Sequence, residues 1–108
     1  MKIKPLPLLH QPPSPDLQEF IENLKTTAAK HGYRPTELID MIRRHKLKPA
    51  IEKLVCSGDI QSGLERLHQL GLLHLSIESA VLKFHKEFSE DAQKCAEFRL
   101  RMVKEKKR

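Results

Sequence analysis

The residue types that most often carry chemistry are present in this chain, but not at spacings that make a site. Six histidines and two cysteines, Cys56 and Cys95, occur in 108 residues. They form no H-x-x-x-H or C-x-x-C pair, the spacings that bring two metal ligands together. The sequence also lacks a glycine-rich loop that could hold a phosphate. We therefore predict no catalytic, cofactor-binding or metal site, and a protein that is not an enzyme.

Arg99 is the residue whose position most needs a physical explanation. If the residues after Ser89 form a helix, Arg99 falls near the middle of its apolar arc. A guanidinium there must extend to solvent, pair with a carboxylate or bind a ligand anion. Glu78 is the best internal partner, because it lies in the first turn of another expected helix, where a negative charge also suits the helix dipole. We expect a structural ion pair between Glu78 and Arg99, with extension of Arg99 to solvent as the alternative.

The net charge of +6 is concentrated in two short stretches. Residues 41–53 sum to +4 and residues 99–108 to +5, whereas residues 1–40 sum to zero and residues 54–98 to −3. Such basic clusters can contact phosphates or an acidic partner, although they are more often solvated surface. The candidate contacts are Arg43, Arg44, Lys46, Lys48, Arg101, Lys104, Lys106, Lys107 and Arg108.

Apolar residues recur at helical spacing in several segments that are joined by very short turns. We expect six helices, beginning near Pro15, Pro35, Pro49, Ile60, Ile77 and Glu90. The last of them carries Ala92, Cys95, Ala96, Phe98, Met102 and Val103. No alternation typical of a strand occurs over a useful length. The sequence therefore predicts an all-α fold, a compact orthogonal bundle of about six short helices.

The same pattern divides the chain into three regions. Residues 1–14 contain four prolines and are expected to form an irregular proline-rich arm. Residues 15–103 form a single helical domain, and residues 104–108 are a basic C-terminal tail. Within the domain, Gly63 lies on the apolar stripe of the fourth helix, which predicts close approach of a neighbouring helix.

Two absences bear on where the protein works. No stretch approaches the roughly twenty apolar residues of a membrane span, and the first residues do not read as a signal peptide. The two cysteines are expected to be reduced thiols, because nothing points to an oxidising compartment. We therefore predict a cytoplasmic protein with no membrane partner. Homo-oligomerisation is compatible with the sequence, since its many leucines leave room for an exposed apolar stripe.

Five short motifs resemble a pattern in small all-helical domains of uncharacterised bacterial proteins. They are YRPTELIDM at 33–41, SGLERL at 62–67, LSIE at 75–78, FS at 88–89 and RL at 99–100. The resemblance covers roughly residues 33–101 and implies a bacterial source and a compact helical fold. The positions of Pro35, Glu78 and Arg99 recur in that pattern, which implies helix capping and an architectural ion pair. It implies no activity.

These observations favour a non-enzymatic module that binds another protein through its helical surface or its proline-rich arm. The alternative is a nucleic-acid-binding accessory protein that contacts phosphates through residues 41–53 and 99–108. The two hypotheses differ in whether the two basic patches converge in space. A small enzyme would require a pocket that gathers His45, Glu78 and Arg99.

Overall fold

The structure is a computed structural model that describes residues 11–57 and 62–105. Within these ranges it contains six α-helices and no strand, so the predicted all-α fold is confirmed. The helices are α1 (Pro15–Lys30), α2 (Thr36–His45), α3 (Leu47–Val55), α4 (Ser62–Gln69), α5 (Ile77–Lys83) and α6 (Glu90–Glu105). Two short 3-10 turns, Leu73–Leu75 and His85–Glu87, flank α5. None of the described helices is long and apolar enough to cross a membrane.

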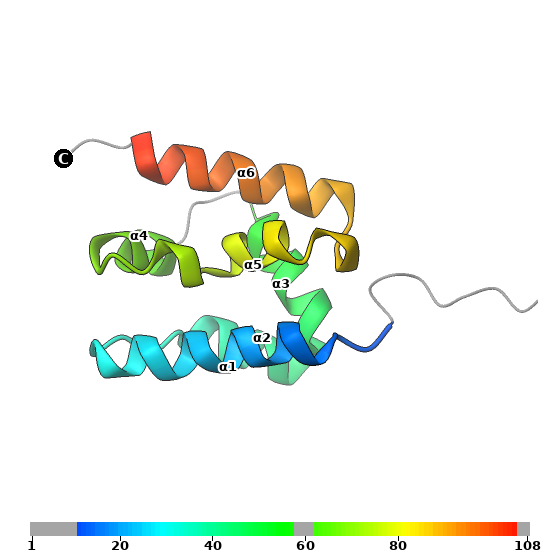
Figure 1. The fold of residues 1–108 in the computed structure, drawn as a ribbon, viewed down its shortest axis with the longest axis horizontal. Coiled ribbons are helices and arrows are strands. Elements are labelled where there is room, and N and C mark those ends of the chain that lie inside the picture. The colour runs from blue at the N-terminus through cyan, green and yellow to red at the C-terminus, as the bar shows by residue number, and fades with distance from the viewer. Residues whose placement is uncertain (1–10, 58–61, 106–108) are drawn as a thin grey trace, which may run out of the picture.

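The helices form layers that α3 connects (Figure 1). In that view α1 and α2 occupy the lower layer, α6 runs along the top, and α4 and α5 lie between them. The axis of α3 rises from the lower layer toward α6. As a result α6 packs on α5, α3 and α4, whereas α2 packs on α3.

A single hydrophobic core holds these layers together. In α1 the buried residues Leu17, Ile21, Leu24 and Ala28 form the expected stripe at helical spacing. The largest fully buried apolar side chains of the described chain are Leu17, Ile21, Leu24, Ile51, Val55, Val81 and Phe88. They come from α1, α3, α5 and the segment directly before α6. The core therefore holds the point from which α6 starts.

Serine side chains cap three of the helices. The hydroxyls of Ser14, Ser76 and Ser89 each accept a hydrogen bond at 3.1 Å from the backbone N–H three residues further on. These hydroxyls cap α1, α5 and α6, respectively. Glu52 of α3 also accepts hydrogen bonds from the backbone N–H and hydroxyl of Ser89, at 2.8 and 2.9 Å. This contact ties α3 to the start of α6.

The junction between α2 and α3 differs from the prediction. We expected Pro49 to open the third helix, but α3 begins at Leu47, with Pro49 as its third residue. A proline fits there because the first turn of a helix has N–H groups without an intrahelical acceptor. Lys46 separates the two helices in a left-handed conformation, with φ 73°. Residue 60, where the fourth helix was expected to begin, and most of the proline-rich arm lie outside the described residues.

Candidate functional site

The first basic patch surrounds the junction of α2 and α3. Arg43, Arg44 and Lys46 are exposed, and Arg44 pairs with Asp40, with Nη2 and Oδ2 3.1 Å apart. Lys48 is only 2 % exposed, so the expectation that it contacts a phosphate or an acidic partner is wrong. The reason is its position in α3: it lies three residues before the buried Ile51 and shares that residue's inward face.

The second basic patch lies across the molecule from the first. Arg101 and Lys104 are exposed in the last turns of α6, while Lys106, Lys107 and Arg108 lie outside the described residues. In Figure 1 the C-terminal end of α6 is at the upper left, and the α2–α3 junction is at the lower edge. The described parts of the two patches therefore do not form one continuous surface.

The ion pair expected from the sequence is present in the core. Arg99 Nε donates to Glu78 Oε2 at 2.9 Å, and the two side chains are 4 % and 3 % exposed. Arg99 Nη1 also donates to the backbone oxygen of Ser57 at 3.2 Å and to its hydroxyl oxygen at 3.3 Å. The Ser57 contact could not be read from the sequence. Arg99 thus joins α6 both to α5 and to the residues after α3.

Burial controls the electrostatics of this pair. Removal from water raises the pKa of the Glu78 carboxyl above its ordinary value, and a backbone hydrogen bond and the Arg99 guanidinium offset part of that rise. A buried carboxylate is stable only when such partners are in place. The geometry therefore gives Glu78 and Arg99 a structural role, because each charge is already paired with the other inside the core.

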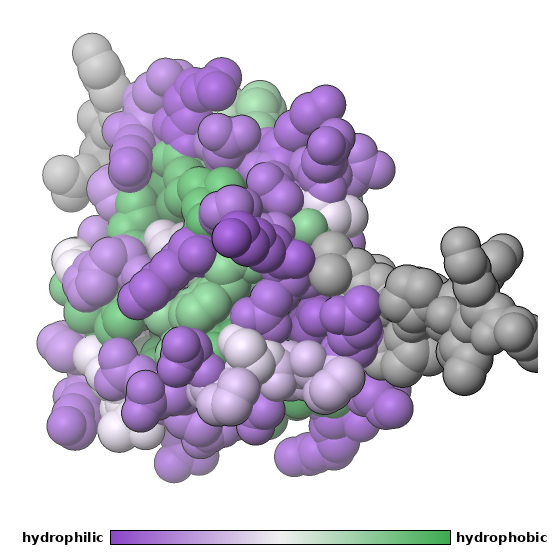
Figure 2. All heavy atoms as spheres, turned by 45° about the vertical axis from the view of Figure 1, so that its right-hand side comes forward, coloured by the Kyte–Doolittle hydropathy of each residue, from purple (hydrophilic) through white to green (hydrophobic). Residues whose placement is uncertain are grey.

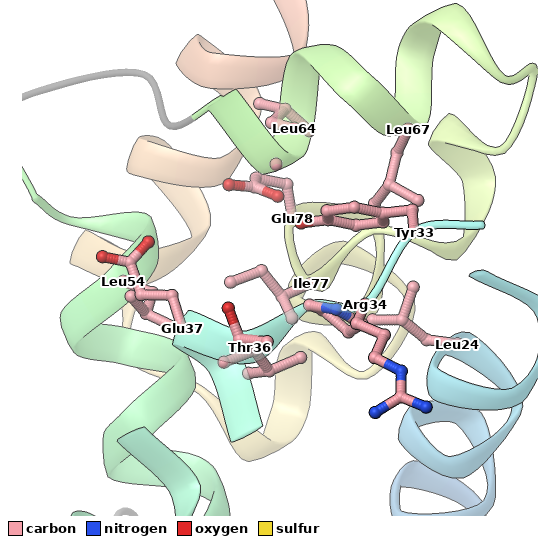
Figure 3. Close-up of a pocket in the computed structure, with 13 residues that line it drawn as sticks. Leu24, Tyr33, Arg34, Thr36, Glu37, Leu54, Leu64, Leu67, Ile77 and Glu78 are labelled. Atoms are coloured by element: carbon pink, nitrogen blue, oxygen red, sulfur yellow. The ribbon is translucent and has the colours of Figure 1, made fainter. Parts of the chain in front are cut away.

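Beside Glu78 is a small cavity of about 160 Å³ between the loop that begins at Tyr33 and helices α3, α4 and α5. Figure 3 shows the Tyr33 ring lying across it with its hydroxyl toward Glu78, while the Arg34 guanidinium points away. Burial, followed by the charges of Glu37 and Glu78, raises the pKa of Tyr33. His45 is exposed on α2 and does not line this cavity. The pocket that an enzyme hypothesis required is thus not assembled among the described residues.

Gly63 completes one wall of the cavity. A Cβ atom at this position would collide with the Tyr33 hydroxyl oxygen. The close approach predicted at Gly63 is therefore real, but a tyrosine side chain makes it rather than a helix. In the described ranges no group of three histidine, cysteine or acidic side chains could hold a metal ion.

The outer face of α6 has a different character. Phe98 is 54 % exposed and Met102 39 % exposed, and they are the large hydrophobic side chains that the described chain leaves open to solvent. They lie one helical turn apart, and Lys94 and Glu105 are exposed on the same side of the helix. We call these four residues the α6 face. On the side of the molecule shown in Figure 2, most residues are hydrophilic and the hydrophobic ones gather in the left half.

Phe98 and Met102, two of the apolar residues carried by the last expected helix, do not lie on its buried side. The buried side is made by Ala92, Ala96, Arg99 and Val103. Phe98 precedes Arg99 by one residue and is therefore rotated from it by about 100°. A helical wheel drawn around Arg99 would have placed Phe98 outside the core.

No family model, curated protein or solved structure matches this chain.

Proposed function

We propose that this chain is a non-enzymatic protein–protein interaction module and that the α6 face is its docking surface. The observation that carries the proposal is the exposure of Phe98 and Met102, 54 % and 39 %. Single exposed apolar residues are common, but two large ones in adjacent turns of one helix form a continuous apolar strip. The bacterial source that we propose with it rests on the resemblance of residues 33–101, and the cytoplasmic location stays a separate prediction.

The occupant that best fits the α6 face is a second copy of the chain. In an antiparallel pair of α6 helices, Phe98 can lie opposite Met102 of the other copy. Lys94 precedes Phe98 by one turn, and Glu105 follows Met102 by about one turn. In this arrangement Lys94 of one copy therefore lies opposite Glu105 of the other. Two-fold symmetry repeats both contacts, so the same register pairs apolar with apolar and positive with negative twice.

The charges also select against the parallel arrangement. In a parallel in-register pair each residue faces its own copy, so Lys94 would meet Lys94 and Glu105 would meet Glu105. Among the described residues, neither Lys94 nor Glu105 makes an ion pair within the chain. As far as the described residues go, both charges can pair with an antiparallel copy.

The exposed area sets the expected strength of this association. With roughly 200 Å² for a fully exposed side chain of this size, Phe98 and Met102 together offer about 180 Å² per copy. A standard interface buries about 800 Å² per partner. We therefore expect a weak dimer, with a dissociation constant in the micromolar range or above.

Two observations favour this proposal over phosphate contact by the basic patches. The described parts of the patches are separated across the molecule, so one duplex segment would not meet both at once. Within the first patch, Lys48 is buried and Arg44 is already paired with Asp40. Both observations reduce the positive charge available to a phosphate.

Sedimentation equilibrium of the full chain over a range of concentrations tests the proposal. We expect reversible dimerisation of the wild type, which Phe98→Asp abolishes. Thr26→Asp is the matched control, because it adds the same charge at an exposed position of α1 and should leave dimerisation intact. A monomeric wild type, or an equal effect of both variants, would refute docking through α6. Salt-sensitive binding of a labelled DNA duplex that falls in an Arg43→Ala, Arg44→Ala chain would instead support the nucleic-acid alternative.

A further inference from the structure

The fold brings together two cysteines that are 39 positions apart in the sequence. Cys56 follows the last residue of α3, and Cys95 lies in α6. The Cys56 thiol donates a hydrogen bond to the backbone oxygen of Asp91, with Sγ and O 3.9 Å apart. In a regular helix that same oxygen accepts the backbone N–H of Cys95, four residues on. The Cys56 sulfur therefore lies beside Cys95.

The interaction between the two cysteines and their exposure to solvent support this placement. The Cys95 side chain also interacts electrostatically with the Cys56 thiol. Neither forms a disulfide, and Cys56 is exposed while Cys95 is half-buried. A small reagent can thus reach the pair from solvent. This site uses neither Phe98 nor Met102 and is independent of the docking proposal.

We propose that Cys56 and Cys95 form a redox-responsive dithiol that closes to an intramolecular disulfide when it meets a small-molecule disulfide such as oxidised glutathione. In the first step one protein thiolate attacks a glutathione sulfur, forms a mixed disulfide and releases one glutathione thiolate. In the second, the other protein thiolate attacks the cysteine sulfur of the mixed disulfide and releases the second glutathione. Two protein thiols are oxidised and one glutathione disulfide is reduced to two thiols.

The local electrostatics favour the protonated form of the Cys56 thiol. Although Cys56 is exposed, partial desolvation by neighbouring atoms, interactions with Cys95, and the charges of Glu52 and Asp91 raise its pKa to about 12. Loss of a proton from this thiol is therefore disfavoured at neutral pH, and exchange should become faster as the pH rises.

Closure would fasten α6 to the end of α3. A cross-link between residues 56 and 95 removes conformations from the unfolded chain, which raises the melting temperature by on the order of 10 °C for a loop of this length. The Ser89–Glu52 contact already holds the start of α6 against α3. The disulfide would add a covalent connection between the same two helices.

Mass spectrometry of the full chain after treatment with oxidised glutathione and then an alkylating reagent tests the inference. We expect the wild type to lose two hydrogens, carry no alkyl group or glutathione, and melt at a higher temperature until a reductant is added. Cys56→Ser and Cys95→Ser should end as glutathione adducts or alkylated thiols with no rise in melting temperature. The Cys56→Ser, Cys95→Ser double variant controls for effects of the reagent elsewhere. A wild type that keeps both thiols, accumulates a stable glutathione adduct or forms only intermolecular disulfides would overturn the proposal.

Discussion

Replacement of Arg99 by methionine tests the buried ion pair most severely. Methionine keeps the apolar stem of the side chain but removes the guanidinium, so the Glu78 carboxylate stays in the core without the partner now 2.9 Å away. Because the two side chains are only 4 % and 3 % exposed, solvent cannot replace that partner. Removing one member of a buried pair costs about 3–5 kcal/mol in the free energy of unfolding. That is a large share of the roughly 5–15 kcal/mol that holds a domain together.

The pH dependence of this loss has a definite sign. Burial already raises the pKa of Glu78 in the folded state, and Arg99 opposes that rise, so Arg99→Met should raise it further. Between the ordinary pKa of glutamate and this raised value, the folded state binds more protons than the unfolded state. The free energy of unfolding contributed by Glu78 is therefore full below the ordinary pKa and is lost as the pH rises through the raised one. We expect the deficit of the variant to be largest at neutral pH and smaller in mild acid.

Urea unfolding followed by far-ultraviolet circular dichroism, at neutral pH and in mild acid, measures the loss of stability in the variant. Arg101→Met is the matched control, because it makes the same substitution on the same helix at an exposed position. Its stability should stay within about 0.5 kcal/mol of the wild type. The reasoning is refuted if Arg99→Met differs from this control by less than about 1 kcal/mol at neutral pH, or if the difference does not shrink in acid.

Three further predictions concern the contacts around Tyr33 and α6. Gly63→Ala should lower the free energy of unfolding, measured in urea, by about 1 kcal/mol or more, because the new Cβ meets the Tyr33 hydroxyl. Adding Tyr33→Phe should restore part of this loss, and a Gly63→Ala chain as stable as the wild type would disprove the close contact. Alkaline titration followed by phenolate absorbance should show the pKa of Tyr33 above 10.0, and Glu37→Gln should lower it; a pKa at or below the ordinary value would contradict its burial. Glu52→Ala should lower the free energy of unfolding by about 1–3 kcal/mol, because the backbone N–H and hydroxyl of Ser89 lose their acceptor; thermal unfolding no different from wild type would show that water replaces the carboxylate.

The sequence was sufficient where the physics is local. Helical spacing of apolar residues predicts all six helices, and serine before a helical run predicts the caps at Ser76 and Ser89. The Glu78–Arg99 contact was also within reach, because a cation in the middle of an apolar arc requires a buried anion and Glu78 was the best placed. In each case the prediction needed only the residues of one helix, or one charged residue on the apolar side of a helix.

Other features depend on how separate elements meet, and periodicity does not report that. The burial of Lys48 follows from where α3 begins, which a proline at its third position obscured. The contact of Gly63 with Tyr33 joins α4 to a loop 30 residues earlier. The meeting of Cys56 with Cys95 requires the packing of α3 on α6. Phe98 is an exception, since the position of Arg99 on the helical wheel would have shown that it faces outward.

Sedimentation equilibrium of two oppositely charged variants, separately and mixed, tests the antiparallel α6 dimer most directly. Lys94→Glu makes both charges of the α6 face negative, and Glu105→Lys makes both positive, so each variant alone should dimerise less than the wild type. In an equimolar mixture each negative position meets a positive one on the other chain, so dimerisation should recover, and adding Phe98→Asp to either chain should abolish it again. A mixture that sediments as the sum of the two separate proteins, or single variants that dimerise as the wild type does, would contradict docking through α6.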